Sequence, residues 1–259
     1  MVNSSEMKER IKLLIRDWLP LGVRNQRILS GMLKGYRIYT SWHDYPAAIL
    51  GYTERSLLEW FENNILPGEN WLDVGAHYGY TAIALSKCVG PTGSVYAFEP
   101  SISTAGYLVQ TRVKNNLRQL TVVPFGLGGL DDLEILALPF ERGMLDSTKD
   151  GSDWLETLFV TRLDWLWPKI CGEKENIDGI KIDVQGMEID VLRGMSRSLK
   201  IHKPKLIIEL HKGVDRDEFL RQIKSSGYST DAISLVADEQ GTVNKLLDDT
   251  SYVFLPNRL

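Results

Sequence analysis

The stretch Asp73-Val74-Gly75-Ala76-His77-Tyr78-Gly79-Tyr80 decides the fold of this chain. It follows a short apolar run at 70–74, which predicts a strand, and leads into 80–88, which predicts a helix. Gly75 permits the sharp turn that such a connection needs, and Gly79 permits a second close approach where the helix begins. The stretch therefore predicts the first strand-to-helix turn of a parallel sheet.

The same alternation of strand and helix continues towards the C-terminus. Alternating strands and helices imply right-handed crossovers, so we expect a doubly wound, mostly parallel α/β sheet that ends in antiparallel strands. The region 126–176 interrupts the alternation with two extra strands and a polar loop at 142–154. Strands are expected at 95–98, 120–125, 134–138, 159–163, 180–184, 206–210, 232–236 and 252–255, and helices at 104–116, 188–199 and 218–226. Before this region, the alternation of Tyr36, Ile38 and Thr40 with other residues predicts a short strand at 36–40.

Composition sets the class of protein. The chain has 259 residues, of which 43% are hydrophobic and 25% charged, with a net charge of −4. This balance is typical of a globular protein, and it argues against a bulk electrostatic grip on nucleic acid. No apolar run is long enough for a membrane span. Cys88 and Cys171 fit no metal or redox motif, so we expect reduced thiols and a cytoplasmic location.

The turn after the first strand also discriminates between cofactors. In an open parallel sheet, ligands bind at the carboxyl ends of the strands. A dinucleotide needs G-x-G-x-x-G for its pyrophosphate, but here His77 and Tyr80 occupy the second and third glycine positions. S-adenosylmethionine carries no phosphate and needs only a glycine-lined turn, and the acidic Asp73 suits its ammonium and sulfonium charges. The sequence therefore predicts S-adenosylmethionine as cofactor.

An acidic residue at the end of the second strand supports this prediction. Glu99 follows the loop at the distance typical of an acid that accepts hydrogen bonds from ribose hydroxyls. Pro100 cannot extend the strand, so the carboxylate lies at the strand's end. The candidate cofactor-binding residues are Asp73, Gly75, Ala76, His77, Tyr78, Gly79, Tyr80, Glu99, Pro100, Ser101, Gly126 and Asp183.

The fourth core strand runs into Lys181-Ile182-Asp183-Val184-Gln185-Gly186-Met187-Glu188. With the 73–79 loop, Phe98-Glu99-Pro100, Leu163-Asp164 and the strand at 204–211, this run resembles the FkbM family of methyltransferases over roughly residues 47–230. The resemblance implies a class I methyltransferase fold, S-adenosylmethionine as methyl donor and, usually, a hydroxyl oxygen as acceptor. The family usually has glutamate where this chain has Gln185.

Three residues are candidates for the chemical step. Strand alternation places Asp183 at the carboxyl end of its strand, over the expected cofactor. His211 ends the next strand at the same edge, and its ordinary pKa suits proton transfer near neutrality. Glu188 lies in the first turn of a helix, where a capping role is the alternative to a catalytic one. Because no dense set of metal ligands occurs, we predict no metal site.

Two other functions remain as alternatives: a nicotinamide-dependent oxidoreductase, and a non-catalytic nucleoside-binding protein of the same fold. A hydrolase is disfavoured because no G-x-S-x-G elbow occurs. We divide the chain into an N-terminal helical and aromatic segment, 1–67, which acts as a lid or a cover of the acceptor site, and a cofactor-binding domain, 68–259. An amphipathic helix at 6–19 covers a sheet edge or serves as the arm of a homodimer.

Overall fold

A computed structural model describes most of the chain. The expected helix at 6–19 lies outside the described residues, apart from Leu19, and so does most of the 142–154 loop. None of the described helices is long and apolar enough to cross a membrane. The described residues are 19–130, 133–141, 144–145, 155–172, 176–236, 242–243 and 246–257.

The described residues form an eight-stranded central sheet in the order β13-β12-β14-β11-β10-β3-β4-β5. Strands β5, β4, β3, β10 and β11 are parallel, whereas β14 lies antiparallel between β11 and β12. This confirms the predicted doubly wound, mostly parallel sheet with antiparallel strands from the C-terminal part of the chain. The strands are β3 (Asn70–Val74), β4 (Ser94–Phe98), β5 (Leu120–Val123), β10 (Gly179–Ile182), β11 (Lys205–Leu210), β12 (Ala232–Ser234), β13 (Thr242–Val243) and β14 (Thr250–Phe254).

The strand order changes direction between β3 and β10. From β3 the chain builds outward through β4 and β5, then returns to place β10 and β11 on the other side of β3. Loops that leave two such strands diverge to opposite faces and open a crevice, which is where ligands bind in this type of sheet. The turn after Val74 and the turn after Ile182 therefore border the expected binding site.

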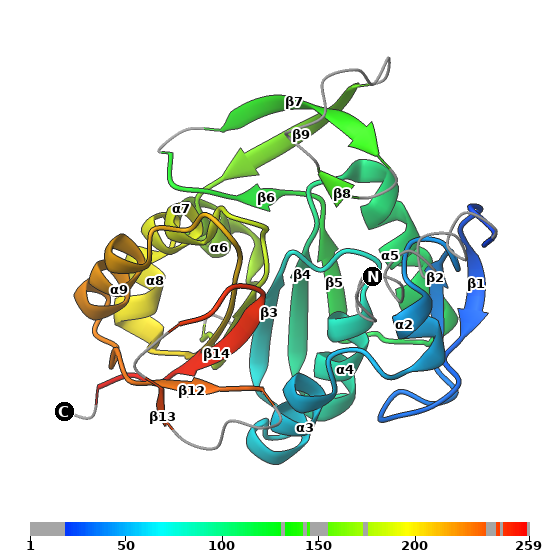
Figure 1. Ribbon diagram of the computed structural model, residues 1–259, viewed down its shortest axis with the longest axis horizontal. Coiled ribbons are helices and arrows are strands. Elements are labelled where there is room, and N and C mark those ends of the chain that lie inside the picture. Colours follow the sequence, from blue (N-terminus) through cyan, green and yellow to red (C-terminus); the bar gives the residue numbers. More distant parts are fainter. Residues whose placement is uncertain are drawn as a thin grey trace, which may run out of the picture.

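Helices cover both faces of this sheet (Figure 1). One core contains side chains of α6 to α9, such as Leu166, Leu192 and Phe219, and the other contains side chains of α3 to α5, such as Phe61 and Leu108. The helices are α2 (Pro46–Leu50), α3 (Arg55–Asn64), α4 (Tyr80–Val89), α5 (Ile102–Lys114), α6 (Leu163–Ile170), α7 (Glu188–Gly194), α8 (Ser196–His202) and α9 (Arg216–Ser225).

The expected helix at 188–199 is two helices, α7 and α8, that meet at Met195. The carboxylate of Asp164 explains where the second one begins, because it accepts hydrogen bonds from the backbone N–H groups of Arg197 and Ser198. Those N–H groups lie in the first turn of α8, where backbone N–H groups have no acceptor within the helix. Leu163 was expected to end a strand at 159–163, but it is the first residue of α6.

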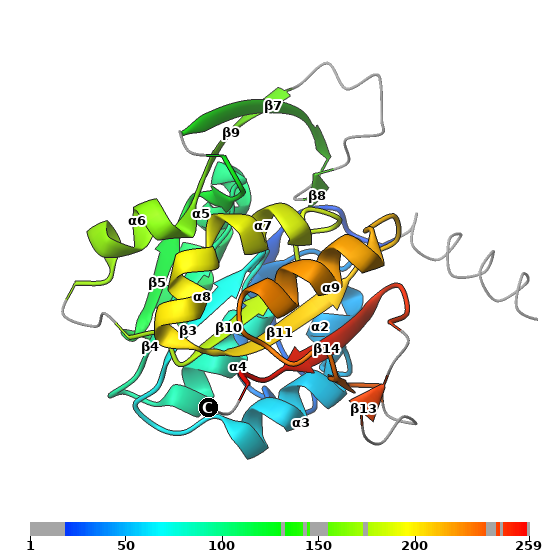
Figure 2. The ribbon, with the colours of Figure 1, turned by 90° about the vertical axis from the view of Figure 1, so that its left-hand side faces the viewer.

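A second sheet with the order β6-β9-β7-β8 lies beyond the carboxyl ends of the central strands. Figure 2 shows β7 and β9 arching over the rest of the molecule. The sequence predicted β7 and β9, but it did not predict the two-residue strands β6 and β8, which pair with β9 and β7. The strands are β6 (Gly126–Leu127), β7 (Glu134–Glu141), β8 (Met144–Leu145) and β9 (Leu155–Thr161).

The N-terminal segment packs into the core of the main sheet. Its hairpin, β1 (Arg24–Arg27) and β2 (Arg37–Thr40), lies against α5 in Figure 1. Ile28, Leu33 and Ile38 are completely buried, in one cluster with side chains of β3 and α4. The sequence predicted the strand at 36–40 but missed β1 and α2, because β1 carries little apolar pattern and α2 has only five residues.

Candidate active site

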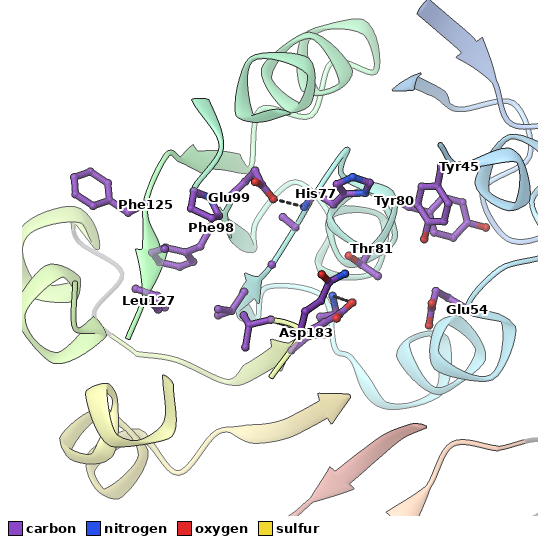
Figure 3. A pocket seen from close by; sticks show the side chains of 18 of the residues that line it. Tyr45, Glu54, His77, Tyr80, Thr81, Phe98, Glu99, Phe125, Leu127 and Asp183 are labelled. Atoms are coloured by element: carbon purple, nitrogen blue, oxygen red, sulfur yellow. Dashed lines mark hydrogen bonds and ion pairs between the residues drawn. The ribbon is translucent and has the colours of Figure 1, made fainter. Parts of the chain in front are cut away.

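A cavity of about 350 Å³ opens at the carboxyl edge of the central sheet, at the change in strand order. Its walls come from the turns that follow β3, β4, β5 and β10, and from the segment that precedes α3 (Figure 3). This volume lies in the range of small-molecule sites. The cavity therefore occupies the place where the topology predicted a ligand.

The glycines of the 73–80 turn serve the packing of the protein more than direct contact with a ligand. Gly75 has φ +82°, and a Cβ there would collide with the backbone carbonyl of Asp183. Gly79 has φ +93°, and a Cβ there would collide with Leu108. The sequence correctly pointed to close backbone approaches, but at both positions the approaching group belongs to the protein itself.

Glu99 organises the loop from the end of β4. Its side chain is buried; Oε2 accepts a hydrogen bond from the His77 backbone N–H at 2.9 Å, and Oε1 accepts one from the Ser101 backbone N–H at 3.0 Å. Burial nevertheless raises the pKa of Glu99 to about 7, because these two bonds compensate only partly for lost solvation. The hydroxyl groups of a ribose could donate further hydrogen bonds to this carboxylate. The site therefore fits a ribose-bearing cofactor.

A buried ion cluster joins the turns after β3 and β10. Lys181 is almost completely buried, with its Nζ 3.5 Å from Asp73 Oδ1 and 3.3 Å from Asp183 Oδ2. Burial lowers the Lys181 pKa, but the nearby carboxylates, first those of Asp183 and Asp73, more than offset this, so the net shift is upward and the side chain is a cation. Thr81 donates a further hydrogen bond to Asp73. Asp73 thus supports the loop from behind the cavity.

His211 lies among three carboxylates at the ends of β10 and β11. Its Nδ1 is 2.8 Å from Glu188 Oε1, and its Nε2 is 3.5 Å from Asp183 Oδ1 and 3.8 Å from Glu209 Oε1. The hydrogen bond to Glu188 is the main cause that raises the His211 pKa. Burial, together with Asp183 and Glu54, raises the pKa of Glu209 to about 7. The structure therefore brings the three predicted catalytic residues together and adds Glu209.

The N-terminal segment forms the opposite wall of the cavity. Tyr45 and Glu54 lie across from Asp183 in Figure 3, and the Tyr45 ring contacts the rings of His77 and Tyr80 at 5.8 and 6.0 Å. Burial is the main cause that raises the pKa values of Tyr45 and Glu54. Tyr45 belongs to the aromatic N-terminal segment that was predicted to cover the acceptor site, whereas no local sequence pattern indicates a role for Glu54.

The predicted cofactor-binding residues fall into two groups. Asp73 and Gly79 support the turn without lining the cavity, the Tyr78 hydroxyl donates instead to Asp44, and Ser101 caps α5. Several other lining residues, such as Glu54 and Leu127, were not predicted, because single acidic or apolar side chains carry no local signal. The predicted residues that line the cavity are Gly75, Ala76, His77, Tyr80, Glu99, Pro100, Gly126 and Asp183.

Comparison with known proteins agrees with this arrangement. The family model described as the methyltransferase FkbM domain matches residues 73–230, which is more than half of the chain and contains the loop, Glu99, Asp183 and His211. Hexuronic acid methyltransferase AglP of Haloferax volcanii is 28% identical over 182 residues, which cover 68% of this chain and 70% of that protein.

Two of the solved structures that this chain resembles have low sequence identity to it. A methyltransferase FkbM from Methylobacillus flagellatus KT has 18% identity and a TM-score of 0.48, and the match covers 80% of this chain and 52% of that chain. Fibrillarin of Aeropyrum pernix, solved with natively bound S-adenosyl-L-methionine, has 15% identity and a TM-score of 0.48, and the match covers 90% and 83%. The domain match is the stronger finding.

Proposed function

This chain belongs to the FkbM family of S-adenosylmethionine-dependent methyltransferases, and from that premise we propose that it methylates a hydroxyl oxygen of a sugar or another small molecule. The observation that carries the proposal is the Asp183–His211–Glu188 arrangement at the margin of the cavity. In this arrangement Asp183 would accept a hydrogen bond from the acceptor hydroxyl, and His211 would accept its proton.

The donor side of the cavity is formed by the 75–80 turn and Glu99. Bound S-adenosylmethionine supplies a methyl group that is already activated on a sulfonium. Glu99 would accept hydrogen bonds from the ribose hydroxyls, and Gly126 and Pro100 lie beside it on the cavity wall. His77 fills the place where a dinucleotide would need bare backbone, which supports this cofactor over a nicotinamide.

The acceptor side lies near Asp183. Asp183 Oδ2 is held by Lys181, so Oδ1 is the oxygen left to orient a hydroxyl. The hydroxyl oxygen attacks the methyl carbon in line, the carbon–sulfur bond breaks with its electron pair on sulfur, and the hydroxyl proton is taken up by the Asp183–His211 pair. Alignment and exclusion of water provide most of the catalysis, because the leaving group needs no further activation.

The charge of the acceptor side favours a neutral hydroxyl. Asp183, Glu209 and Glu54 lie on this side, and Lys181 is already paired with Asp183 and Asp73. A carboxylate acceptor would add a further negative charge at short range, which is unfavourable in a partly buried site. The name of the AglP relative supports a sugar as the acceptor class, and the charge supports a hydroxyl as its reacting group.

A radiolabelled methyl-transfer assay tests the proposal. The full chain is incubated with S-adenosylmethionine labelled in its methyl group and a panel of neutral sugars, hexuronic acids and simple alcohols. We expect S-adenosylhomocysteine to bind in calorimetry, and base-stable labelling of hydroxyl-bearing products. Labelling lost in mild alkali would indicate a methyl ester and contradict the proposed acceptor group, and a failure to bind S-adenosylhomocysteine would contradict the donor site.

A further inference from the structure

We propose that Asp183, Glu209 and His211 form a binding site for one divalent metal ion at the acceptor side of the cavity. Each of the three residues offers one ligand atom, and these atoms all lie within 4.8 Å of one another. The sequence alone predicted no metal site, because Glu209 and His211 lie at the end of β11 and Asp183 directly follows β10, so that they meet only in the folded sheet.

The separations suit a shared cation. The Nε2 atom of His211 is 3.5 Å from Asp183 Oδ1 and 3.8 Å from Glu209 Oε1. An ion with metal–ligand bonds of about 2.1 Å separates adjacent ligand atoms by roughly 3.0 Å in octahedral and roughly 3.4 Å in tetrahedral coordination. The two carboxylate oxygens therefore need to approach His211 Nε2 by less than about 1 Å to share an ion with it.

The second oxygen of each carboxylate, which does not face the proposed ion, is held by another residue. Lys181 Nζ lies 3.3 Å from Asp183 Oδ2, and the Ser251 hydroxyl donates to Glu209 Oε2 at 3.4 Å. Each carboxylate therefore has one oxygen free to bind the proposed ion. Outer contacts of this kind orient the ligands of metal sites and are a large part of their affinity.

His211 is held in the tautomer that a metal ligand needs. Glu188 is completely buried, and its Oε1 accepts a hydrogen bond from His211 Nδ1 at 2.8 Å. The proton of a neutral imidazole is thereby placed on Nδ1, so Nε2 presents a lone pair towards Asp183 and Glu209. A carboxylate behind a histidine is the usual support of a metal-bound imidazole.

Charge and access also favour an ion here. The side chains of Asp183, Glu209 and His211 are 30%, 20% and 18% exposed, so the ligand atoms are accessible but partly desolvated. Asp183 lines the cavity directly. The carboxylates of Asp183, Glu209 and Glu188 surround the imidazole, whereas Lys181 is the cation paired with Asp183. A divalent ion would offset this excess of negative charge.

One imidazole nitrogen and two carboxylate oxygens suit a divalent first-row ion such as Mn²⁺ or Zn²⁺. With three protein ligands, coordination positions remain for water or for the acceptor hydroxyl. A hydroxyl bound to the ion loses its proton to solvent more readily, and the ion then activates the hydroxyl in place of the imidazole. Binding of the ion is independent of the proposed function, whereas this role in activation rests on it.

Titration of the full chain with Mn²⁺ tests the site. The protein is treated with a chelator, desalted and titrated with MnCl₂, and free Mn²⁺ is measured by electron paramagnetic resonance. We expect one Mn²⁺ per chain, and an affinity at least about tenfold weaker in Glu209→Gln and in His211→Asn. Glu59→Gln is the matched control, because Glu59 is exposed on α3, away from the cavity, and should leave the affinity unchanged.

Either of two results would overturn the metal site. One is that the wild-type chain shows no saturable Mn²⁺ binding. The other is that Glu209→Gln and His211→Asn, both folded, bind Mn²⁺ as tightly as the wild-type chain. Glu209→Gln and His211→Asn are independent tests, and a thermal unfolding transition shows which of them is folded. S-adenosylhomocysteine affinity measured on the same samples separates the two proposals, because a chain that binds Mn²⁺ but no S-adenosylhomocysteine retains the metal site and loses the proposed function.

Discussion

The imidazole of His211 donates through Nδ1 to the completely buried carboxylate of Glu188, over 2.8 Å. The contact joins the end of β11 to the first residue of α7, and it directs the opposite ring nitrogen to Asp183. Glu188 also accepts from the backbone N–H of Gly186, in the turn where this chain carries Gln185. The proposed acceptor side therefore depends on a residue that does not line the cavity.

Glu188→Gln should reduce turnover while leaving cofactor affinity unchanged. The amide cannot accept as strongly as a carboxylate, so the His211 ring loses its fixed tautomer, and we expect a loss of about 10- to 100-fold. The loss should appear in kcat more than in the dissociation constant of S-adenosylhomocysteine. Equal losses in both quantities would assign Glu188 to the stability of the fold instead.

Asp183→Asn and His211→Asn test the chemical step itself. Loss of the group that activates the acceptor hydroxyl typically costs about 10²- to 10⁴-fold in rate. We expect that loss in methyl transfer, with S-adenosylhomocysteine affinity retained, because neither side chain is required for the ribose contact. Near-normal turnover in both variants would show that alignment alone is sufficient and that the two residues are structural.

Glu99→Gln tests ribose recognition and its pH dependence. Each hydrogen bond lost from a charged acceptor costs about 1.5–3 kcal/mol, so S-adenosylhomocysteine should bind roughly tenfold or more weakly. Because Glu99 has a pKa of about 7 and binding favours its ionised form, wild-type affinity should rise about tenfold between about pH 6 and 8. Calorimetry at the two pH values checks this, and the rise should be absent in Glu99→Gln.

The same shift affects the stability of the protein without cofactor. A carboxyl whose pKa is higher in the folded than in the unfolded state favours folding at low pH, and that contribution is lost as pH rises from about 4.5 to about 7. Urea unfolding across this range should show a smaller decline in Glu99→Gln than in the wild-type chain. An identical decline would place the titrating group elsewhere.

Lys181→Met should destabilise the fold. The substitution leaves Asp73 completely buried without its cation, and breaking one partner of a buried ion pair costs about 3–5 kcal/mol. Lys87→Met is the matched control, because the Lys87–Glu62 pair is 37% and 48% exposed and contributes at most about 1 kcal/mol. Urea denaturation of both variants measures the difference, and equal midpoints would contradict the prediction.

Ile28→Ala tests whether the N-terminal segment belongs to the core. Ile28 is completely buried, so removal of its side chain should cost about 2–5 kcal/mol of unfolding free energy. The neighbouring Leu29 is 51% exposed, and Leu29→Ala should stay within about 0.5 kcal/mol. Similar effects at the two positions would indicate that the segment is a loosely attached cover, as the division at residue 67 predicts.

Much of the fold could be predicted from local pattern. The strand at 70–74 matches β3 at both ends, and the helices expected at 80–88 and 104–116 differ from α4 and α5 by at most two residues at each end. These elements are long or strongly apolar, so period and length suffice. The break at Met195 was missed because its cause, the Asp164 cap, lies more than thirty residues away in the chain.

The sequence by itself determined the order of the parallel core strands along the chain, the glycine turn after β3, and the positions of Glu99, Asp183 and His211 at strand ends. Each of these has a local signal, because a glycine turn or a polar residue at a strand end is visible within a few neighbouring positions. Only the tertiary structure decided that Glu209 lies beside Asp183, and that Glu54 faces Asp183 across the cavity. Such contacts arise where parallel strands end at one edge and a distant segment folds over them, and no short window of sequence contains both partners.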